Sequence, residues 1–247
     1  MVGNLMNDKS LIELYGDRSV NSVSKFAKVF QELEISCLFK KYQELVESAP
    51  HRHETGKKYF VGHEMFRGGK EGSNRKEEIL AGDLFNQCQK GKSFLLSDNR
   101  KLKIIDYQFP LKARRGDKGI GKVDLFGVID DEIPCVIELK VDQKENRKPD
   151  TPLRALLEGL AYCAIIEGNQ KDIWQEAKEK FDLTFKEPRP HLIILAPEEY
   201  WSYYFQKDSA GNWTAGFSEL VLKLKEHPFP STLFISLKNH SWHWVRL

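Results

Sequence analysis

Two acidic residues and a lysine in the middle of the chain have a spacing that could support phosphate chemistry. Thirteen residues separate Asp124 from Glu138, and Lys140 follows two positions later. The stretches around them are rich in valine, isoleucine and leucine, as strands are, and the acidic turn at residues 130–132 predicts a hairpin between them. Because side chains alternate faces along a strand, Glu138 and Lys140 point the same way, and Asp124 lies opposite or diagonal to Glu138.

Charged groups gathered on one patch of an apolar sheet lose hydration, and neighbouring carboxylates repel each other. A divalent cation relieves both costs, because Mg²⁺ binds through one or two carboxylates, keeps waters and takes further ligands from substrate phosphates. Lys140 could then orient or deprotonate the attacking water and stabilise the developing charge. The pattern predicts hydrolysis of a phosphodiester. The alternative is an ordinary ion pair on an exposed sheet face.

The elements expected around these residues are those of an α/β protein. Apolar residues at helical spacing predict a helix over 74–90, and a second helix begins after Asp150 or Thr151 as its cap and runs to Ile166. One long helix is predicted over Ser22–Glu47. Strands are predicted over 102–107, 122–129, 135–141, 191–195, 232–237 and 242–247, and further helices over 172–181, 198–205 and 217–227.

The pattern of Asp124, thirteen residues and then Glu138-Leu139-Lys140 resembles the PD-(D/E)XK nuclease superfamily, which includes restriction-endonuclease-like and RecB-like nucleases. The predicted order of helix, three-strand meander, helix and strand is also the core order of that superfamily. The resemblance covers residues 74–197, about half of the chain. It implies a restriction-endonuclease-like core, that is, a mixed central β-sheet flanked by helices, with an N-terminal helical extension.

The resemblance also implies roles for individual residues. Asp124 and Glu138 are implied ligands of Mg²⁺ or Mn²⁺, and a backbone carbonyl near Glu138, such as that of Leu139, is a further one. Lys140 is the implied catalytic lysine. Glu77 continues the inward stripe of the first core helix and is implied as a secondary metal contact. The alternative is that Glu77 only favours the helix N-terminus electrostatically.

Three residues of the helix that follows residue 150 belong to the same hypothesis. Arg154, Glu158 and Tyr162 recur every four residues and therefore share one helix face. Glu158 and Tyr162 resemble the Q-x-x-x-Y element of the RecB-like branch, with Glu in place of Gln, and Val123 stands where the superfamily often has proline. The alternatives are an exposed Arg154–Glu158 ion pair and a core tyrosine bonded to backbone.

Two basic stretches flank the predicted strand pair. The first contains Lys112, Arg114, Arg115, Lys118 and Lys122 around a single acid, and the second contains Lys144, Arg147 and Lys148. Such residues could hold the phosphates of a nucleic acid through contacts that salt weakens. Each stretch taken alone is more simply a solvated loop.

Composition excludes several classes of protein. The 247 residues include 38 Lys+Arg and 36 Asp+Glu, so the net charge of +2 argues against binding by bulk charge but not against a local basic strip. With 40% hydrophobic and 30% charged residues, the chain is neither fibrous nor wholly disordered. The longest apolar run, Leu160–Ile166, is far shorter than the roughly 18–20 residues of a membrane span.

The remaining signals concern location and partners. The first ten residues have no secretion pattern, and the four cysteines form no CxxC, so we expect a cytoplasmic protein without membrane contact and without structural zinc. Residues 1–73 are predicted as an N-terminal helical and loop extension, and residues 74–247 as the nuclease-like domain. The extension could recognise a target, bind a partner protein or form a homodimer.

We therefore predict a Mg²⁺- or Mn²⁺-dependent nuclease that acts on nucleic acid, with DNA as the expected substrate, in restriction, phage defence or repair. The alternative is a protein that keeps the nuclease fold without turnover and binds nucleic acid or assembles with a partner. The intact Asp124, Glu138 and Lys140 argue against this alternative, because a decayed site usually loses one of its residues.

Overall fold

The computed structural model describes residues 9–68, 76–141, 150–206, 213–238 and 241–245. Within them the chain is an α/β protein built on one sheet of seven strands. The strands are β1 (Phe94–Leu95), β2 (Lys101–Pro110), β3 (Lys122–Ile129), β4 (Ile133–Leu139), β5 (His191–Pro197), β6 (Thr232–Lys238) and β7 (Ser241–Trp244). The helices are α1 (Leu11–Tyr15), α2 (Phe26–Gln31), α3 (Ile35–Glu47), α4 (Lys76–Gln89), α5 (Pro152–Gly168), α6 (Gln170–Phe181), α7 (Glu198–Gln206) and α8 (Trp213–Lys225), with a 3₁₀ turn, η1, at His53–Thr55.

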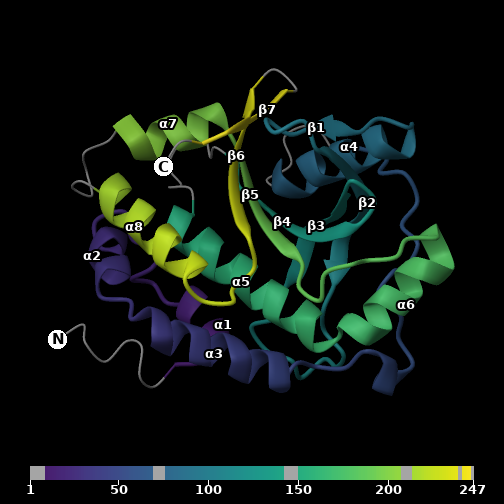
Figure 1. Cartoon of the computed structure of the whole chain (residues 1–247), viewed down its shortest axis with the longest axis horizontal. Helices are drawn as coiled ribbons and strands as arrows, with labels where there is room; N and C mark the ends of the chain where they lie inside the picture. Colours follow the sequence, from purple (N-terminus) through teal and green to yellow (C-terminus); the bar gives the residue numbers. More distant parts are fainter. Residues whose placement is uncertain (1–8, 69–75, 142–149, 207–212, 239–240, 246–247) are drawn as a thin grey trace.

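The sheet is mixed, as the family resemblance implies. Its strands follow one another in chain order from β1 to β7. Strands β1 to β4 form an antiparallel meander, β4, β5 and β6 are parallel, and β7 is antiparallel to β6. Parallel neighbours need crossovers, which α5 with α6 and α7 with α8 supply. The sheet curls into a half-barrel, so that β7 also comes against β1 (Figure 1).

Alternation along β3 and β4 divides their side chains between two hydrophobic layers. Leu125 and Ile137 face the layer that α4 completes. Phe126 and Val136 face the larger layer, which contains the apolar residues of α5. Because side chains of opposite parity lie on opposite faces, the even-numbered residues of this hairpin point toward α5.

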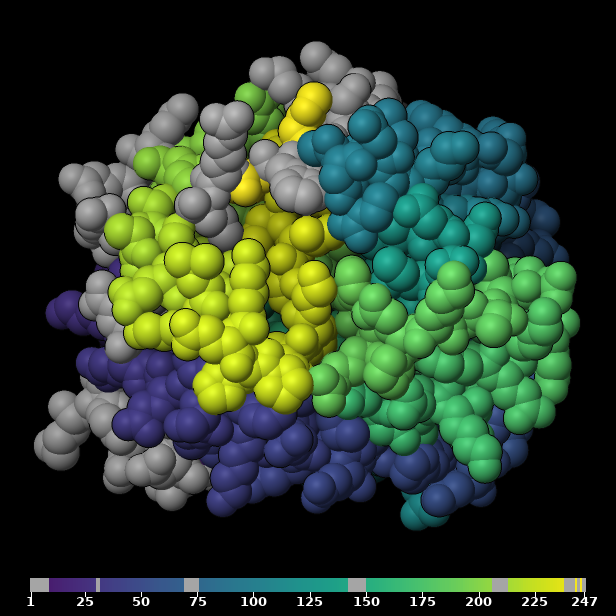
Figure 2. Space-filling view, viewed as in Figure 1, coloured from purple at the N-terminus to yellow at the C-terminus, as the bar shows by residue number. Residues whose placement is uncertain are grey.

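The N-terminal helices pack on the same side of the sheet as α5. Residues 26–47 lie beside α8, and both are visible on one face of the molecule (Figure 2). Their apolar side chains belong to the same hydrophobic layer as those of α5, and the Tyr42 hydroxyl donates to Glu167 Oε2 of α5 at 2.7 Å. The partner and dimer contacts proposed for this extension stay predictions.

The prediction of one helix over Ser22–Glu47 is wrong. The chain forms α2 and α3, and Glu34 between them has an extended backbone. Helix α2 packs mainly against α8, whereas α3 packs mainly against α5. One straight helix cannot follow both partners, so tertiary packing breaks it where Leu33 is buried.

The hairpin that carries the acidic residues forms as predicted, but its second strand covers Ile133–Leu139 instead of 135–141 and ends before Lys140. Strand β3 begins and ends at the predicted residues, and β4 pairs with it around the turn at residues 130–132. Asp130 and Asp131 have φ angles of 50° and 58°, the left-handed geometry that suits the twist of a tight hairpin. The register of this turn fixes which side chains of the two strands meet.

Candidate functional site

Asp124 and Glu138 lie on one face of the β3–β4 hairpin. Leu125 pairs with Ile137 and Phe126 with Val136, so the same register sets Asp124 opposite Glu138. The Leu139 N–H bonds to the Asp124 side chain and not to the backbone of β3: Asp124 Oδ2 accepts this hydrogen bond at 2.9 Å. Asp124 Oδ1 faces the Gln108 amide nitrogen at 3.4 Å. The first acidic residue is thus fixed by both neighbouring strands.

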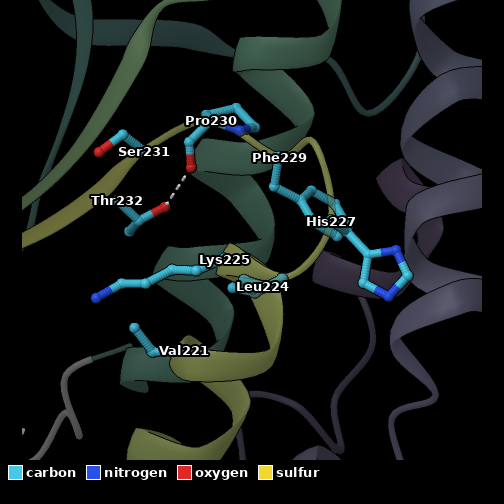
Figure 3. A pocket seen from close by; sticks show the side chains of 8 residues that line it. All are labelled: Val221, Leu224, Lys225, His227, Phe229, Pro230, Ser231 and Thr232. Carbon is cyan, nitrogen blue, oxygen red and sulfur yellow. Dashed lines mark hydrogen bonds between the residues drawn. The ribbon is translucent and has the colours of Figure 1, made fainter.

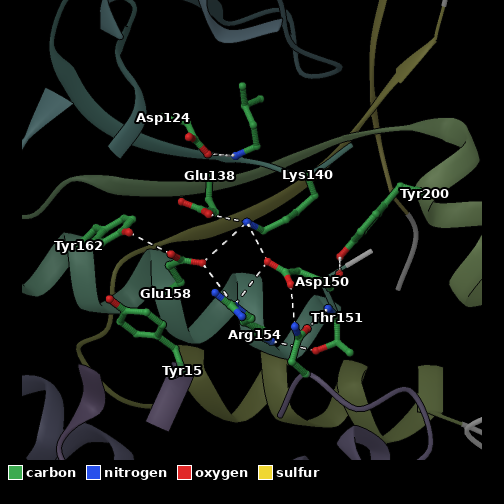
Figure 4. Close-up of polar contacts among 12 residues, drawn as sticks. Tyr15, Asp124, Glu138, Lys140, Asp150, Thr151, Arg154, Glu158, Tyr162 and Tyr200 are labelled. Atoms are coloured by element: carbon green, nitrogen blue, oxygen red, sulfur yellow. Dashed lines mark hydrogen bonds and ion pairs between the residues drawn. The ribbon is translucent and has the colours of Figure 1, made fainter. Parts of the chain in front are cut away.

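Lys140 is the centre of the cluster. Its Nζ donates to Glu138 Oε1 at 2.7 Å and lies 3.7 Å from Glu158 Oε2 and 3.8 Å from Asp150 Oδ2 (Figure 4). The side chains of Lys140 and Glu138 are only 4% and 3% exposed. The ammonium therefore sits between the end of β4 and the first two turns of α5.

Helix α5 contributes a row of polar side chains at every fourth residue. Arg154 Nε lies 3.4 Å from Asp150 Oδ2 and 3.8 Å from Glu158 Oε2, and Tyr162 donates to Glu158 Oε1 at 2.9 Å. Thr151 is the N-cap of the helix and accepts from the Arg154 N–H. Arg154, Glu158 and Tyr162 do share one face, and Glu158 is turned toward Lys140 rather than being one half of an exposed pair.

Glu77, in the first turn of α4, approaches the cluster from the other side. Its carboxyl group lies close to the Val141 backbone, just beyond β4. Burial raises its pKa, and the nearby Lys140 ammonium lowers it. Glu77 therefore interacts with the groups around Lys140 in addition to its place at a helix N-terminus.

Five carboxyl groups surround two cations in this cluster. The acids are Glu77, Asp124, Glu138, Asp150 and Glu158, and the cations are Lys140 and Arg154. Burial raises the pKa of Asp124 to about 7, although Lys140 and the Leu139 N–H lower it. Burial also raises the pKa of Glu138 well above its ordinary range, more than Lys140 lowers it. Burial is the main cause of this proton affinity, and the neighbouring carboxylate of Glu158 adds to it at both residues.

Burial has the opposite effect on the ammonium of Lys140. Burial lowers its pKa, but the carboxylates around it, Glu138 and Glu158 foremost, raise it more and keep it well above its ordinary value. Lys140 is therefore a firmly charged hydrogen-bond donor.

The donor set suits a hard divalent cation. Glu138 Oε2 is buried and has no hydrogen-bond partner, and an orphaned buried carboxylate oxygen calls for an explanation. Within the described residues no three His, Cys, Asp or Glu side chains are arranged to hold a metal by themselves. Mg²⁺ needs only one or two carboxylates and fills its shell with water and phosphate oxygens, so Asp124 and Glu138 fit it. The role of the Leu139 carbonyl stays a prediction.

The first basic stretch forms an exposed loop between β2 and β3. All five of its predicted cations are exposed, and they form no ion pair with any described residue: Lys112, Arg114, Arg115, Lys118 and Lys122. The acid among them, Asp117, accepts from the Ala113 and Arg114 N–H groups at 2.8 Å each. Lys144, Arg147 and Lys148 lie outside the described residues.

Two residues of the cluster, Asp150 and Gln108, are not predicted as site residues. The sequence predicts Asp150 only as a helix cap, although it continues the four-residue spacing of Arg154, Glu158 and Tyr162 by one turn, which is a usable signal. Gln108 reaches Asp124 because the register of β2 and β3, with Tyr107 opposite Leu125 and Phe109 opposite Val123, sets the two residues opposite each other. No local pattern marks such a residue.

A separate cavity of about 260 Å³ lies at the end of α8 and the start of β6 (Figure 3). Its lining residues, between 221 and 232, include no carboxylate, and Lys225 and His227 are their only ionisable side chains. It shares no residue with the cluster around Lys140.

No protein-family model, curated protein or solved structure matches the chain. Among the residues that the structure describes, no helix is both long and apolar enough to cross a bilayer. The function is therefore inferred from the cluster around Lys140.

Proposed function

We propose that the chain is a metal-dependent nuclease of the PD-(D/E)XK type, with a restriction-endonuclease-like core and with DNA as its expected substrate. The observation that carries this proposal is the meeting of Asp124, Glu138 and Lys140 in a buried cluster with more acids than cations. The unpaired Glu138 Oε2 supports it, because a bound cation would satisfy that oxygen.

Asp124 and Glu138 would hold Mg²⁺ or Mn²⁺, with Glu77 near enough to assist. When bound, the ion supplies a Lewis acid for the scissile phosphate and a more acidic bound water. Lys140 donates hydrogen bonds from Nζ and stabilises charge that develops on the phosphate. Its raised pKa makes the orienting role, rather than proton abstraction, the one we assign to it. Glu158 and Asp150 hold the ammonium from the α5 side.

Two observations favour the second candidate, a nuclease-fold protein that binds nucleic acid without cutting it. Lys140 Nζ occupies Glu138 Oε1 at 2.7 Å, and in the described part of the chain no three ligating side chains form a metal group. Such a cluster could be a stable ion-pair network. The free Oε2 of Glu138 leads us to prefer the nuclease.

The direct test is cleavage. The full chain is incubated with single- and double-stranded DNA and RNA in Mg²⁺, in Mn²⁺ and in EDTA, beside Glu138→Gln. We expect cleavage in metal only and none by the variant. Binding in EDTA without cleavage of any substrate in either metal would favour the second candidate instead.

The exposed loop predicts salt-sensitive binding. Replacing Arg114 and Arg115 together by alanine should weaken DNA binding in EDTA about tenfold at moderate salt and reduce the slope of log K against log salt by about one per cation removed. Fluorescence anisotropy at several salt concentrations measures both. Lys171 and Lys178, exposed on α6, provide the matched double-alanine control. An unchanged slope would show that the loop is not part of the DNA-binding surface.

A further inference from the structure

The N-terminal helices reach the candidate active site through Tyr15, the last residue of α1. Tyr15 is 6% exposed, and its ring packs edge-on against Tyr162 with 6.3 Å between the centroids. Its hydroxyl donates to the Gly119 carbonyl in the basic loop. Tyr15 therefore joins α1, α5 and the loop at one point, beside Glu158 (Figure 4).

The basic loop closes on Tyr162 from the other side. A side chain at Gly121 would place its Cβ 2.3 Å from the Tyr162 hydroxyl, so only glycine permits this approach. Tyr162 in turn donates to Glu158 Oε1, which leaves Oε2 for Lys140. The direction of the Glu158 carboxylate thus depends on a tyrosine that is held between Tyr15 and the loop.

Asn21, also in the N-terminal segment, holds the other carboxylate near Lys140, that of Asp150 at the start of α5. Its Nδ2 donates to Asp150 Oδ1 at 2.6 Å, and its Oδ1 accepts from the Thr151 N–H at 2.9 Å. The Thr151 hydroxyl donates to the Val20 carbonyl. Asp150 Oδ1 is therefore bound by Asn21, and Oδ2 is left to face Lys140 and Arg154.

Asn21 and Tyr15 act in the same way on two carboxylates, Asp150 and Glu158. Each of the carboxylates that flank Lys140 from α5 has one oxygen fixed by a hydrogen bond and the other directed at the ammonium, at 3.8 Å for Asp150 and 3.7 Å for Glu158. Asn21 fixes the first carboxylate directly, and Tyr15 supports the second through Tyr162. A helical extension that only recognised targets would not need either contact.

We infer that the N-terminal segment is a wall of the active site and that Tyr15 and Asn21 are positioning residues, which set Lys140 through Glu158 and Asp150. This inference rests on the proposed function. It goes beyond that function in assigning part of the catalytic geometry to residues outside the β3–β4–α5 unit.

Two variants of the full chain test it. Tyr15→Phe removes the bond to Gly119 that ties the Tyr15 ring to the basic loop on the two sides of Tyr162. Asn21→Asp keeps the shape and the Thr151 contact but sets a carboxylate against Asp150. We expect kcat to fall about tenfold in each variant, with KM changed less than about threefold. Tyr42→Phe is the matched control, because it removes a buried tyrosine–glutamate bond between the same segment and the other end of α5.

A second measurement does not depend on cleavage. Hydrogen exchange should lose protection at residues 150–158 in Tyr15→Phe and Asn21→Asp, but not in Tyr42→Phe. Wild-type rates in the two variants, or a loss of kcat equal to that of Tyr42→Phe, would overturn the inference while leaving the nuclease proposal standing. Unchanged protection at residues 150–158 would overturn it as well. A wild-type chain that cuts nothing would contradict the proposed function, and with it the catalytic role of both residues.

Discussion

Replacing Lys140 by methionine is expected to slow phosphodiester cleavage by about 10²–10³-fold or more, because the variant loses the buried ammonium that would face the developing charge. Methionine has a similar length and leaves the apolar stem in place. Single-turnover cleavage at saturating Mg²⁺ measures the chemical step, and anisotropy in EDTA measures binding, which should change little. Full activity of the variant would remove the lysine from the mechanism.

The same substitution should also lower stability, contrary to what an exposed ion pair would predict. Lys140 neutralises buried carboxylates, and removing one partner of such a network costs on the order of 3–5 kcal/mol. The loss should be larger at pH 8 than at pH 5, because the acids can take up protons at the lower pH. Lys41, the other buried lysine of the described residues, provides the control Lys41→Met, which should cut normally.

Asp124→Asn should abolish cleavage and yet raise the free energy of unfolding at pH 8. Burial raises the folded-state pKa of Asp124 to about 7, above its value in an unfolded chain. The folded protein therefore binds the extra proton, and the Asp124 contribution to stability falls as pH rises from about 4 to about 7. Removing the charge should recover about 1–4 kcal/mol at pH 8, a range that extends below the full value of the pKa shift because the Asp124 side chain is partly exposed to solvent. It should recover nothing near pH 4.

Urea unfolding of the metal-free protein at pH 4, 6 and 8 measures this effect. Asp106→Asn is the matched control, because Asp106 is a buried aspartate of the neighbouring strand β2 that is bonded to His63. It should not become more stable at pH 8. A variant at Asp124 that is less stable than wild type at every pH would mean that the buried charge is well compensated without a cation.

The central hairpin and its acidic residues could be predicted because their signals are local. A two-residue alternation fixes the faces of β3 and β4, a short acidic turn fixes their register, and Thr151 with Pro152 marks the start of α5. Together these signals place Asp124, Glu138 and Lys140 near one another, whereas only the resemblance to the nuclease superfamily links the α5 row to them.

The remainder of the cluster depends on contacts between distant parts of the chain. Asn21 meets Asp150 across 129 residues, and Tyr15 meets Gly119 across 104. Loop closure over such distances leaves no periodic pattern in the sequence. The break between α2 and α3 has a similar origin, because only the packed partners α8 and α5 decide it.

Calorimetric titration of the full chain with Mg²⁺ and with Mn²⁺ tests the central claim most directly. The chain is titrated at pH 8, alone and with a DNA oligonucleotide, beside the double variant Asp124→Asn/Glu138→Gln. We predict saturable uptake by the wild type, weaker at pH 6 because the pKa of Asp124, raised to about 7, leaves a proton on that carboxyl, and none by the variant. No uptake by the wild type with DNA present, or equal uptake by the variant, would contradict the proposal that these carboxylates hold a cation.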